Sequence, residues 1–97
     1  MASIDERNKT QSYPRVYLTI ARIKKGISGE ELSRKLDITK SYYYSIENGK
    51  RGNKLTVILF AKIIAYLDAD AKEMLAKELN YIKERNLFLK DKRKIKY

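Results

Sequence analysis

Apolar residues recur at helical spacing in five segments, each separated from the next by Gly, Asn or Asp residues. Apolar residues three or four positions apart fall on one face of a helix. The pattern predicts helices over residues 14–25, 29–36, 40–47, 55–67 and 71–85. No segment shows convincing strand alternation, so we expect an all-α fold.

Capping residues give the predicted boundaries. Ser28 followed by Glu31 has the capping-box spacing, in which each side chain bonds the other residue's amide. Further boundaries are expected with Pro14 in the first turn of the first helix, Gly26 as its C-cap, Thr39 as an N-cap and Asn48–Gly49 as a stop.

The two C-terminal predicted helices differ in character. Residues 55–67 are apolar on more than one face and should form the most buried helix. The helix over 71–85 is charged, with Leu75, Leu79 and Ile82 on one side, and the basic residues 90–96 should form a tail.

Positive charge changes this outline of a small helical fold into a prediction about partners. The chain has 97 residues, with 22 Lys and Arg against 12 acids and a formal net charge of +10. Most of the excess lies in residues 13–27, 40–54 and 87–97. Such charge on a small protein is typical of polyanion binding, although a Lys-rich surface can also be merely soluble.

Residue types that are absent exclude several kinds of chemistry. Cys and His do not occur, which removes disulfides, the usual zinc sites and His-based acid/base pairs. Glu30 and Glu31 are neighbours that diverge on a helix. We expect no enzyme activity and no cofactor. We expect no membrane span or signal peptide either, and therefore a cytoplasmic protein.

Two of the predicted helices, 29–36 and 40–47, are separated by Asp37-Ile38-Thr39. That separation is typical of a helix-turn-helix, whose second helix enters a DNA major groove about 12 Å wide. Ile38 can fill the angle between the two helices.

The sequence from Ser28 to Arg51, SGEELSRKLDITKSYYYSIENGKR, resembles the lambda-repressor-like (Cro/cI, XRE-type) helix-turn-helix family. The ending Ile46-Glu47-Asn48-Gly49-Lys50 is its most specific part, and the resemblance covers roughly residues 15–76. It implies a five-helix DNA-binding domain. The chain departs from the family pattern in a longer basic loop after Gly49, in Tyr43 at an aliphatic core position, and in Gly29 where many members carry Gln.

Helical geometry and the resemblance together divide the second helix into two faces. Tyr43 and Ile46 should face Leu32 and Leu36 in the core. The resemblance assigns Lys40, Ser41, Tyr44 and Ser45 to the groove, and Asn48 to a phosphate. The remaining candidate DNA-binding residues are Tyr42 at the DNA-facing edge, Lys50, Arg51 and Lys54 in the basic loop, and the caps Ser28 and Thr39, whose helix N-termini can meet phosphates.

Several alternatives remain open at this point. The run Tyr42–Tyr44 also suits base stacking by a single-strand binder. The basic loop, the arm residues Arg7 and Lys9, and the tail Lys90–Lys96 can equally be solvated. The resemblance places an ion pair between Arg22 and Glu47, the alternative being two independent surface charges.

We therefore expect a flexible arm (1–12), a helix-turn-helix domain (13–86) and a basic tail (87–97) that serves dimerisation or DNA contact. The predicted function is sequence-specific binding of double-stranded DNA by a transcriptional regulator, with repression favoured and no small-molecule effector evident. A homodimer should form through Leu75, Leu79, Ile82 and the stretch Leu87–Leu89, unless the last helix folds back and Phe88 fills a local gap. The alternative function is a protein-interaction module of the same fold, such as an antitoxin or coactivator-like adaptor.

Overall fold

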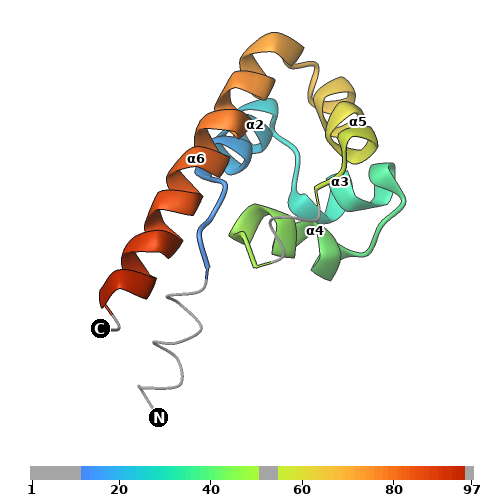
Figure 1. Cartoon of the computed structure of the whole chain (residues 1–97). Coiled ribbons are helices and arrows are strands. Elements are labelled where there is room, and N and C mark those ends of the chain that lie inside the picture. The colour runs from blue at the N-terminus through green and yellow to red at the C-terminus, as the bar shows by residue number, and fades with distance from the viewer. Residues whose placement is uncertain (1–11, 51–54, 96–97) are drawn as a thin grey trace.

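The computed structural model describes residues 12–50 and 55–95, with side chains as far as Leu89. Within these residues there are five helices and no strand, which confirms the all-α prediction (Figure 1). The helices are α2 (Val16–Lys25), α3 (Gly29–Leu36), α4 (Lys40–Asn48), α5 (Val57–Leu67) and α6 (Ala71–Ile95).

Side-chain caps begin four of the described helices, among them α6, where Asp70 Oδ1 accepts the amides of Lys72 at 2.9 Å and Glu73 at 3.4 Å. The Ser28 hydroxyl accepts the amide of Glu31 at 3.0 Å, and the Thr39 hydroxyl accepts that of Tyr42 at 3.0 Å. Both predicted N-caps are therefore confirmed. Another cap, Thr56, bonds the amide of Leu59 at 3.1 Å, so α5 begins at Val57 and not at residue 55 as expected.

A residue in left-handed backbone conformation ends each of α2, α3, α4 and α5. Gly26 and Gly49 have φ values of 76° and 78° and close α2 and α4, as predicted. The Asp residues that end α3 and α5, Asp37 and Asp68, also have positive φ, at 60° and 53°. Asp tolerates this conformation better than most residues because its short polar side chain bonds locally.

The first helix does not include Pro14, which was expected in its first turn. Instead α2 starts at Val16, and Arg15 precedes it with φ −85° and ψ 76°. The Arg15 amide donates to the carbonyl of Glu47 at 2.7 Å. This hydrogen bond to the end of α4 holds the chain out of helical geometry until Val16.

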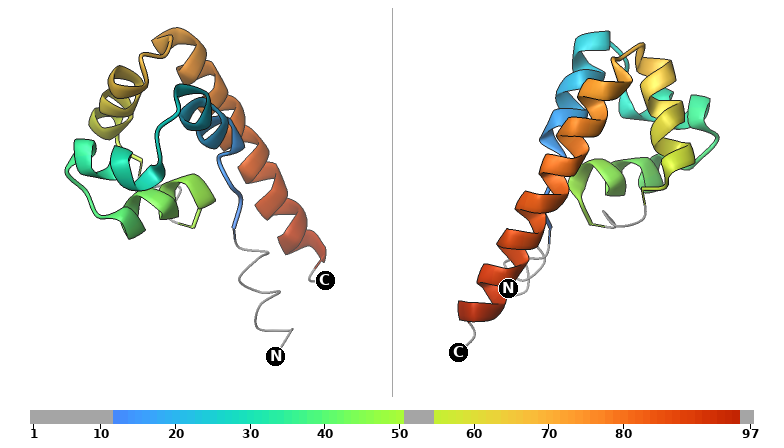
Figure 2. Two further views of the ribbon diagram at one scale, coloured as in Figure 1. Left: turned by 180° about the vertical axis from the view of Figure 1, so that it is seen from behind. Right: turned by 45° about the horizontal axis from the view of Figure 1, so that its top comes forward.

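The last helix is longer than predicted, since α6 continues to Ile95 and does not end near Arg85. Neither Gly nor Pro occurs after Gly52 to stop it, and Lys, Arg and Leu favour helix. Figure 2 shows the C-terminal half of α6 extending past the other four helices. The segment expected as a basic tail is therefore helical over residues 87–95.

One apolar core joins the helices. Leu18, Leu32, Tyr43, Ile46 and Ile63 have no exposed surface, and each fully buried side chain of this size contributes roughly 1.5–3 kcal/mol. The predicted packing of Tyr43 and Ile46 with Leu32 and Leu36 is confirmed. Ile38 packs against the same core, as expected for the residue in the turn.

The face that α6 buries is not its most apolar one. Met74, Glu78 and Tyr81 are buried, whereas Leu75 and Leu79 are 50% and 58% exposed. Helical spacing explains how both rows arise on neighbouring faces of one helix. The apolar row predicted for dimerisation thus lies on the surface.

Candidate nucleic-acid interface

The helix-turn-helix consists of α3 and α4 joined by Asp37, Ile38 and Thr39. Asp37 reverses the chain in the left-handed conformation, and the Thr39 cap starts α4 directly afterwards. With Ile38 packed on the core, the crossing of the two helices is fixed by burial.

The two faces of α4 have opposite character. Its inner face is buried through Tyr43, Ile46 and Glu47. Its outer face carries predicted DNA-binding residues: Lys40, Ser41 and Asn48 are exposed, and Tyr42, Tyr44 and Ser45 are half-buried. The outward-facing set is polar, so it presents hydrogen-bonding groups and not an apolar surface.

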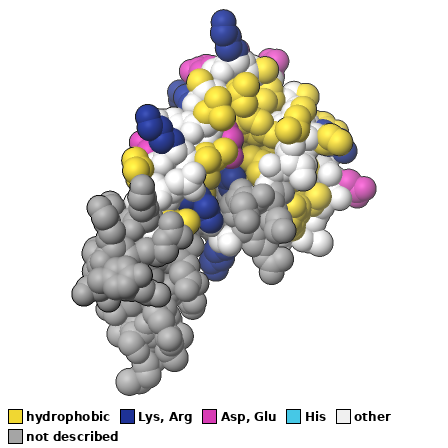
Figure 3. All heavy atoms as spheres, viewed as in Figure 1, with side chains coloured by type: hydrophobic (Ala, Val, Ile, Leu, Met, Phe, Trp, Pro, Cys, Tyr) yellow, Lys and Arg dark blue, Asp and Glu magenta, His cyan; other side chains and the backbone are white. Residues whose placement is uncertain are grey.

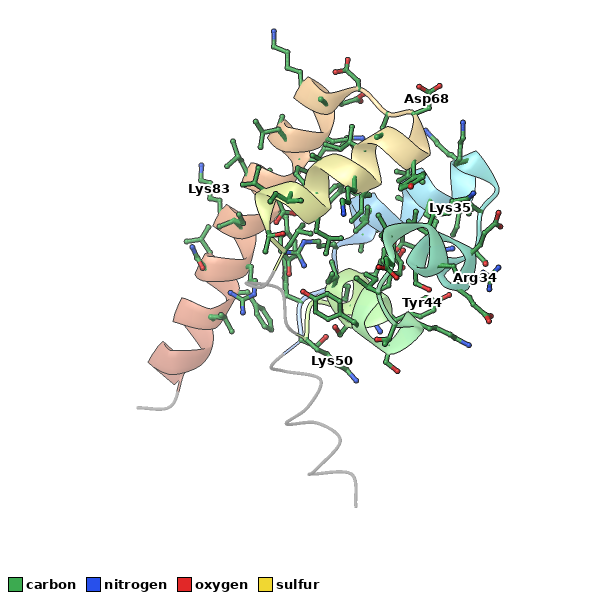
Figure 4. The ribbon with its side chains drawn as sticks, turned by 90° about the vertical axis from the view of Figure 1, so that its right-hand side faces the viewer. Arg34, Lys35, Tyr44, Lys50, Asp68 and Lys83 are labelled. Atoms are coloured by element: carbon green, nitrogen blue, oxygen red, sulfur yellow. The ribbon has the colours of Figure 1, made fainter. Side chains whose placement is uncertain are left out.

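Five of the predicted DNA-binding residues surround one surface hollow of about 320 Å³. They are Thr39, Ser41, Tyr42, Ser45 and Lys50. Figure 4 shows Lys50 at the lower end of α4. The hollow therefore combines hydroxyl groups with a cation, which suits base edges and an adjacent phosphate.

The Ser45 hydroxyl has a defined hydrogen-bonding direction. It donates to the carbonyl of Tyr42 at 2.7 Å, which occupies its one proton. The oxygen lone pairs can still accept. In a major groove such an acceptor matches the amino groups of adenine or cytosine.

Lys40 lies in a loose acidic environment at the start of α4. Its Nζ is 3.9 Å from Glu30, and Arg34 is 3.6 Å from the same carboxylate. All three side chains are more than half exposed. Pairs of this kind contribute about 0–1 kcal/mol, so Glu30 holds Lys40 only weakly.

Tyr44 occupies the space that Gly29 leaves open on α3. A Cβ at Gly29 would overlap the end of the Tyr44 ring, with the hydroxyl oxygen 2.5 Å away. The ring also meets Tyr43 edge-on at 5.8 Å, and the Arg22 guanidinium lies 5.9 Å from its centroid. Tyr44 is thus held at the junction of α3 and α4 (Figure 4).

Glu47 anchors the inner face of α4. Its carboxylate accepts hydrogen bonds from Arg22 Nε at 2.6 Å, the Tyr43 hydroxyl at 2.5 Å and Thr19 at 2.9 Å. The expected Arg22–Glu47 pair is confirmed, with side chains only 11% and 4% exposed. Burial acts to raise the pKa of Glu47, but these hydrogen bonds outweigh it and lower that pKa.

The C-terminal end of α4 is held by residues 12–15, which we call the α4 clamp. The last three carbonyls of α4, those of Ile46, Glu47 and Asn48, accept hydrogen bonds from Arg15 Nη1, Arg15 N and Ser12 Oγ at 2.8, 2.7 and 2.7 Å. The last carbonyls of a helix lack intrahelical amide donors, and the Gly49 cap supplies a bond to Ile46, at 3.2 Å. The clamp therefore supplies what the helix itself lacks.

Sequence reasoning missed the clamp and its partner on α6. Arg15 also forms a bidentate pair with Glu78 at 2.9 and 3.0 Å, and Tyr17 donates to Glu78 at 2.6 Å. The only signal was the position of Glu78 between Met74 and Tyr81 on one helical face. A lone Glu in such a row indicates a buried carboxylate with a distant partner.

Other predicted contacts lie outside the described residues. They are Arg51 and Lys54 in the basic loop, Arg7 and Lys9 in the arm, and the side chains of Lys90–Lys96. In the described part of the chain no group of acidic residues is arranged to hold a metal ion. None of its helices is long and apolar enough to cross a membrane.

Comparison with known sequences assigns the domain. A profile of a helix-turn-helix family matches residues 18–74, which span α2 to the first turn of α6. No curated protein matches the sequence. Since the match covers more than half of the chain and the helices follow the expected order, the chain belongs to the lambda-repressor-like (XRE-type) helix-turn-helix family of DNA-binding regulators.

Proposed function

We propose that this protein is a sequence-specific transcriptional regulator that reads the major groove of double-stranded DNA with α4 and represses by occupying its site. The observation that carries the proposal is the division of α4 into a locked inner face and a polar outer face. Thr39, Ser41, Tyr42, Ser45 and Lys50 converge on one hollow of that outer face.

The residues of α4 have different proposed tasks. Lys40 and Ser41, at the start of the helix, are placed to meet base edges, and Lys suits the O6 and N7 atoms of guanine. Ser45 accepts from a base amino group because its proton is already bonded to Tyr42. Asn48 and Lys50, at the other end, meet phosphates.

Selection of bound sites from a random duplex pool tests the proposal directly. We expect one preferred sequence and strong salt dependence. If each of two subunits neutralises about 4–5 phosphates, the log–log slope of affinity against salt is roughly −7 to −9. Equal affinity for unrelated sequences would refute sequence-specific reading and favour an interaction module of the same fold.

Two alanine variants separate base reading from phosphate contact. Lys40→Ala should change which base is preferred, by about 1–3 kcal/mol at one position. Lys50→Ala should weaken all sequences about equally. Lys77→Ala is the matched control, because it removes the same charge from an exposed residue of α6 that pairs with Glu73. A Lys40 variant that only scales every affinity would contradict its base-reading role.

We further propose that the regulator binds as a symmetric homodimer through α5 and α6. One recognition helix reads only a few base pairs, and pairing two half-sites one helical turn apart restores specificity. Exposed apolar residues gather on the two helices, as Figure 3 shows by the hydrophobic surface over them. They are Val57 and Ile58 on α5 and Leu75, Leu79 and Ile82 on α6, exposed by 84, 71, 50, 58 and 42%.

The stretch Leu87–Leu89 is less exposed than its apolar sequence suggests. Leu87 is 53% exposed, but the Phe88 ring packs on Tyr13 at 5.2 Å. We therefore test the dimer with Leu79→Asp. The matched control is Val16→Asp, which places the same charge on the exposed side of α2. Sedimentation should show a dimer for the control and a monomer for Leu79→Asp. A Leu79→Asp variant with unchanged mass and footprint would place the interface elsewhere.

A further inference from the structure

Arg15 connects α6 to the end of the recognition helix through a single buried guanidinium. Its side chain is 1% exposed. Two of its nitrogens bind the Glu78 carboxylate at 2.9 and 3.0 Å, and the third donates to the Ile46 carbonyl at 2.8 Å. The guanidinium carbon also lies 4.5 Å from the ring centroid of Tyr81.

A second set of contacts attaches the α4 clamp to α6 directly. The Tyr81 hydroxyl donates to the carbonyl of Tyr13 at 2.6 Å. The Tyr13 ring contacts Tyr81 at 5.7 Å and Phe88 at 5.2 Å. At the other side of the clamp, a Cβ on Gly49 would collide with the Tyr13 carbonyl, so the clamp lies directly against the end of α4. Figure 1 shows this segment running between α6 and α4.

We propose that Arg15 and Glu78 are positioning residues for DNA binding. They hold the C-terminal end of α4, with Asn48 and the nearby Lys50, in a fixed position relative to α6. This inference rests on the proposed function. It makes α6 part of the DNA-reading unit in addition to its role in the dimer.

The chemistry of the pair favours positioning over simple stabilisation. A buried ion pair is often no more stable than apolar residues of the same volume. Arg differs from an apolar residue because its planar fork fixes the direction of every hydrogen bond it donates. Here the same guanidinium binds a carboxylate on α6 and a carbonyl on α4, so one rigid group fixes the position of each helix relative to the other.

The Arg22–Glu47 pair already holds the inner face of α4, so loss of the clamp should act locally. Lys40 and Ser41 lie at the opposite end of the helix, next to α3. We therefore expect the phosphate-contacting end to loosen while the base-reading end keeps its place. Phosphate contacts carry no sequence information, so affinity should fall for all sequences.

The first test needs no DNA. In Glu78→Gln, the amide chemical shifts of Asn48, Gly49 and Lys50 should move and those of Lys40 and Ser41 should not. The matched control is Met74→Ala, which loosens α6 at a buried residue one turn earlier without removing any hydrogen bond of the clamp. Shifts that stay near residue 78, or that are the same in both variants, would overturn the inference.

The second test measures DNA binding at a temperature where each variant is folded by circular dichroism. Glu78→Gln and Arg15→Lys should bind the selected site and unrelated duplexes about tenfold more weakly, with the salt slope reduced by about 1 for each subunit. Their base preference should be that of the wild type. Met74→Ala, although destabilised, should bind as the wild type does.

The outcomes distinguish this inference from the proposed function. A wild-type protein that binds no DNA refutes the function, whatever the chemical shifts show. A wild type that binds, with Glu78→Gln equal to Met74→Ala in affinity and slope, refutes the positioning role alone. If Glu78→Gln does not fold, Tyr17→Phe provides the same comparison, because it removes a hydrogen bond to Glu78 and leaves both charges in place.

Discussion

Glu47→Gln is the sharpest test of how the recognition helix is held. The substitution keeps the shape of the side chain and replaces a carboxylate that accepts four hydrogen bonds from Arg22, Tyr43 and Thr19. A glutamine has one accepting oxygen, so its amide nitrogen must face some of these donors. The best arrangement keeps the short bonds from Arg22 Nε and Tyr43 and turns the nitrogen toward Thr19, whose hydroxyl can accept. The 3.3 Å bond from Arg22 Nη2 is then lost.

The magnitude follows from this arrangement. Removing one partner of a buried pair costs about 3–5 kcal/mol, and the surviving hydrogen bonds reduce this for glutamine to about 2–3 kcal/mol. A domain of this size is stable by about 5–15 kcal/mol. At roughly 4–8 °C for each kcal/mol, Tm should fall by about 8–24 °C. Glu47→Ala, which keeps no hydrogen bond, should cost more.

Urea denaturation of a double-mutant cycle measures the coupling. Arg22→Ala, Glu47→Gln and the double variant should give a coupling energy of about 1.5–3 kcal/mol, the range for hydrogen bonds to charged groups. Glu30→Gln is the matched control, because its pair with Arg34 is 3.6 Å long and more than half exposed. It should change stability by about 0–1 kcal/mol. Equal losses for the two Glu variants, with no coupling, would show that the Glu47 pair behaves as a surface pair.

The pH dependence of stability gives an independent test of the role of the Glu47 carboxylate. The pKa of Glu47 is lowered in the folded protein. Its contribution is therefore complete above the unfolded pKa of about 4.3 and is lost as pH falls through the folded pKa. The stability difference between the wild type and Glu47→Gln should stay constant from neutral pH to about 5 and shrink below it. A difference that grows in acid would contradict the assignment.

Three further predictions concern Gly29, Tyr43 and the Gly caps of α2 and α4. Gly29→Ala should destabilise the wild type, because its methyl group displaces Tyr44. In the Tyr44→Ala background the same change should stabilise the protein by about 0.5–1 kcal/mol, as alanine does when it replaces glycine in an open helix. Thermal melts of the wild type, the two single variants and the double variant show whether the sign reverses. Burial and the hydrogen bond to Glu47 raise the pKa of Tyr43. The free energy of unfolding should therefore fall as pH rises through about 10, where this tyrosine ionises only in the unfolded chain. In urea titrations from pH 8 to 11, the free energy of unfolding of Tyr43→Phe should fall less steeply than that of the wild type. Gly26→Ala should lower the free energy of unfolding by about 1–2 kcal/mol, because Gly26 has a positive φ. Gly49→Ala should lower it further, because its methyl group would also meet the Tyr13 carbonyl. Equal losses in urea melts would contradict the close packing at the end of α4.

Local signals in the sequence were sufficient for the helix-turn-helix. Ser28 and Thr39 cap the helices that their spacing predicts, and Gly49 ends the recognition helix. The Arg22–Glu47 pair followed from the family resemblance, and the structure confirms it. These features depend on neighbours in sequence or on a pattern shared by the family, so one sequence is enough to find them.

The packing of α6 depends on partners far away in the sequence and could not be read in the same way. Periodicity treats apolar residues as the buried ones, and it therefore selects the row of Leu75 and Leu79 over the row that contains Glu78. The burial of Glu78 is compensated by two hydrogen bonds from Arg15, 63 positions earlier, and one from Tyr17. The length of α6 was a different error, since the absence of Gly and Pro after residue 52 is visible in the sequence.

The distribution of ion pairs around α4 suits a helix that must exchange partners on one face only. A helix of nine residues is too short to be stable alone, so its direction must come from tertiary contacts. Arg22, on α2, and Arg15, just before α2, hold the inner side and the C-terminal end of α4 with hydrogen bonds of 2.6–2.8 Å. On the outer side, Lys40 has an exposed contact of 3.9 Å with Glu30. Under the proposed function, DNA phosphates or bases replace that contact, whereas the inner contacts resist the change and keep the orientation of the helix.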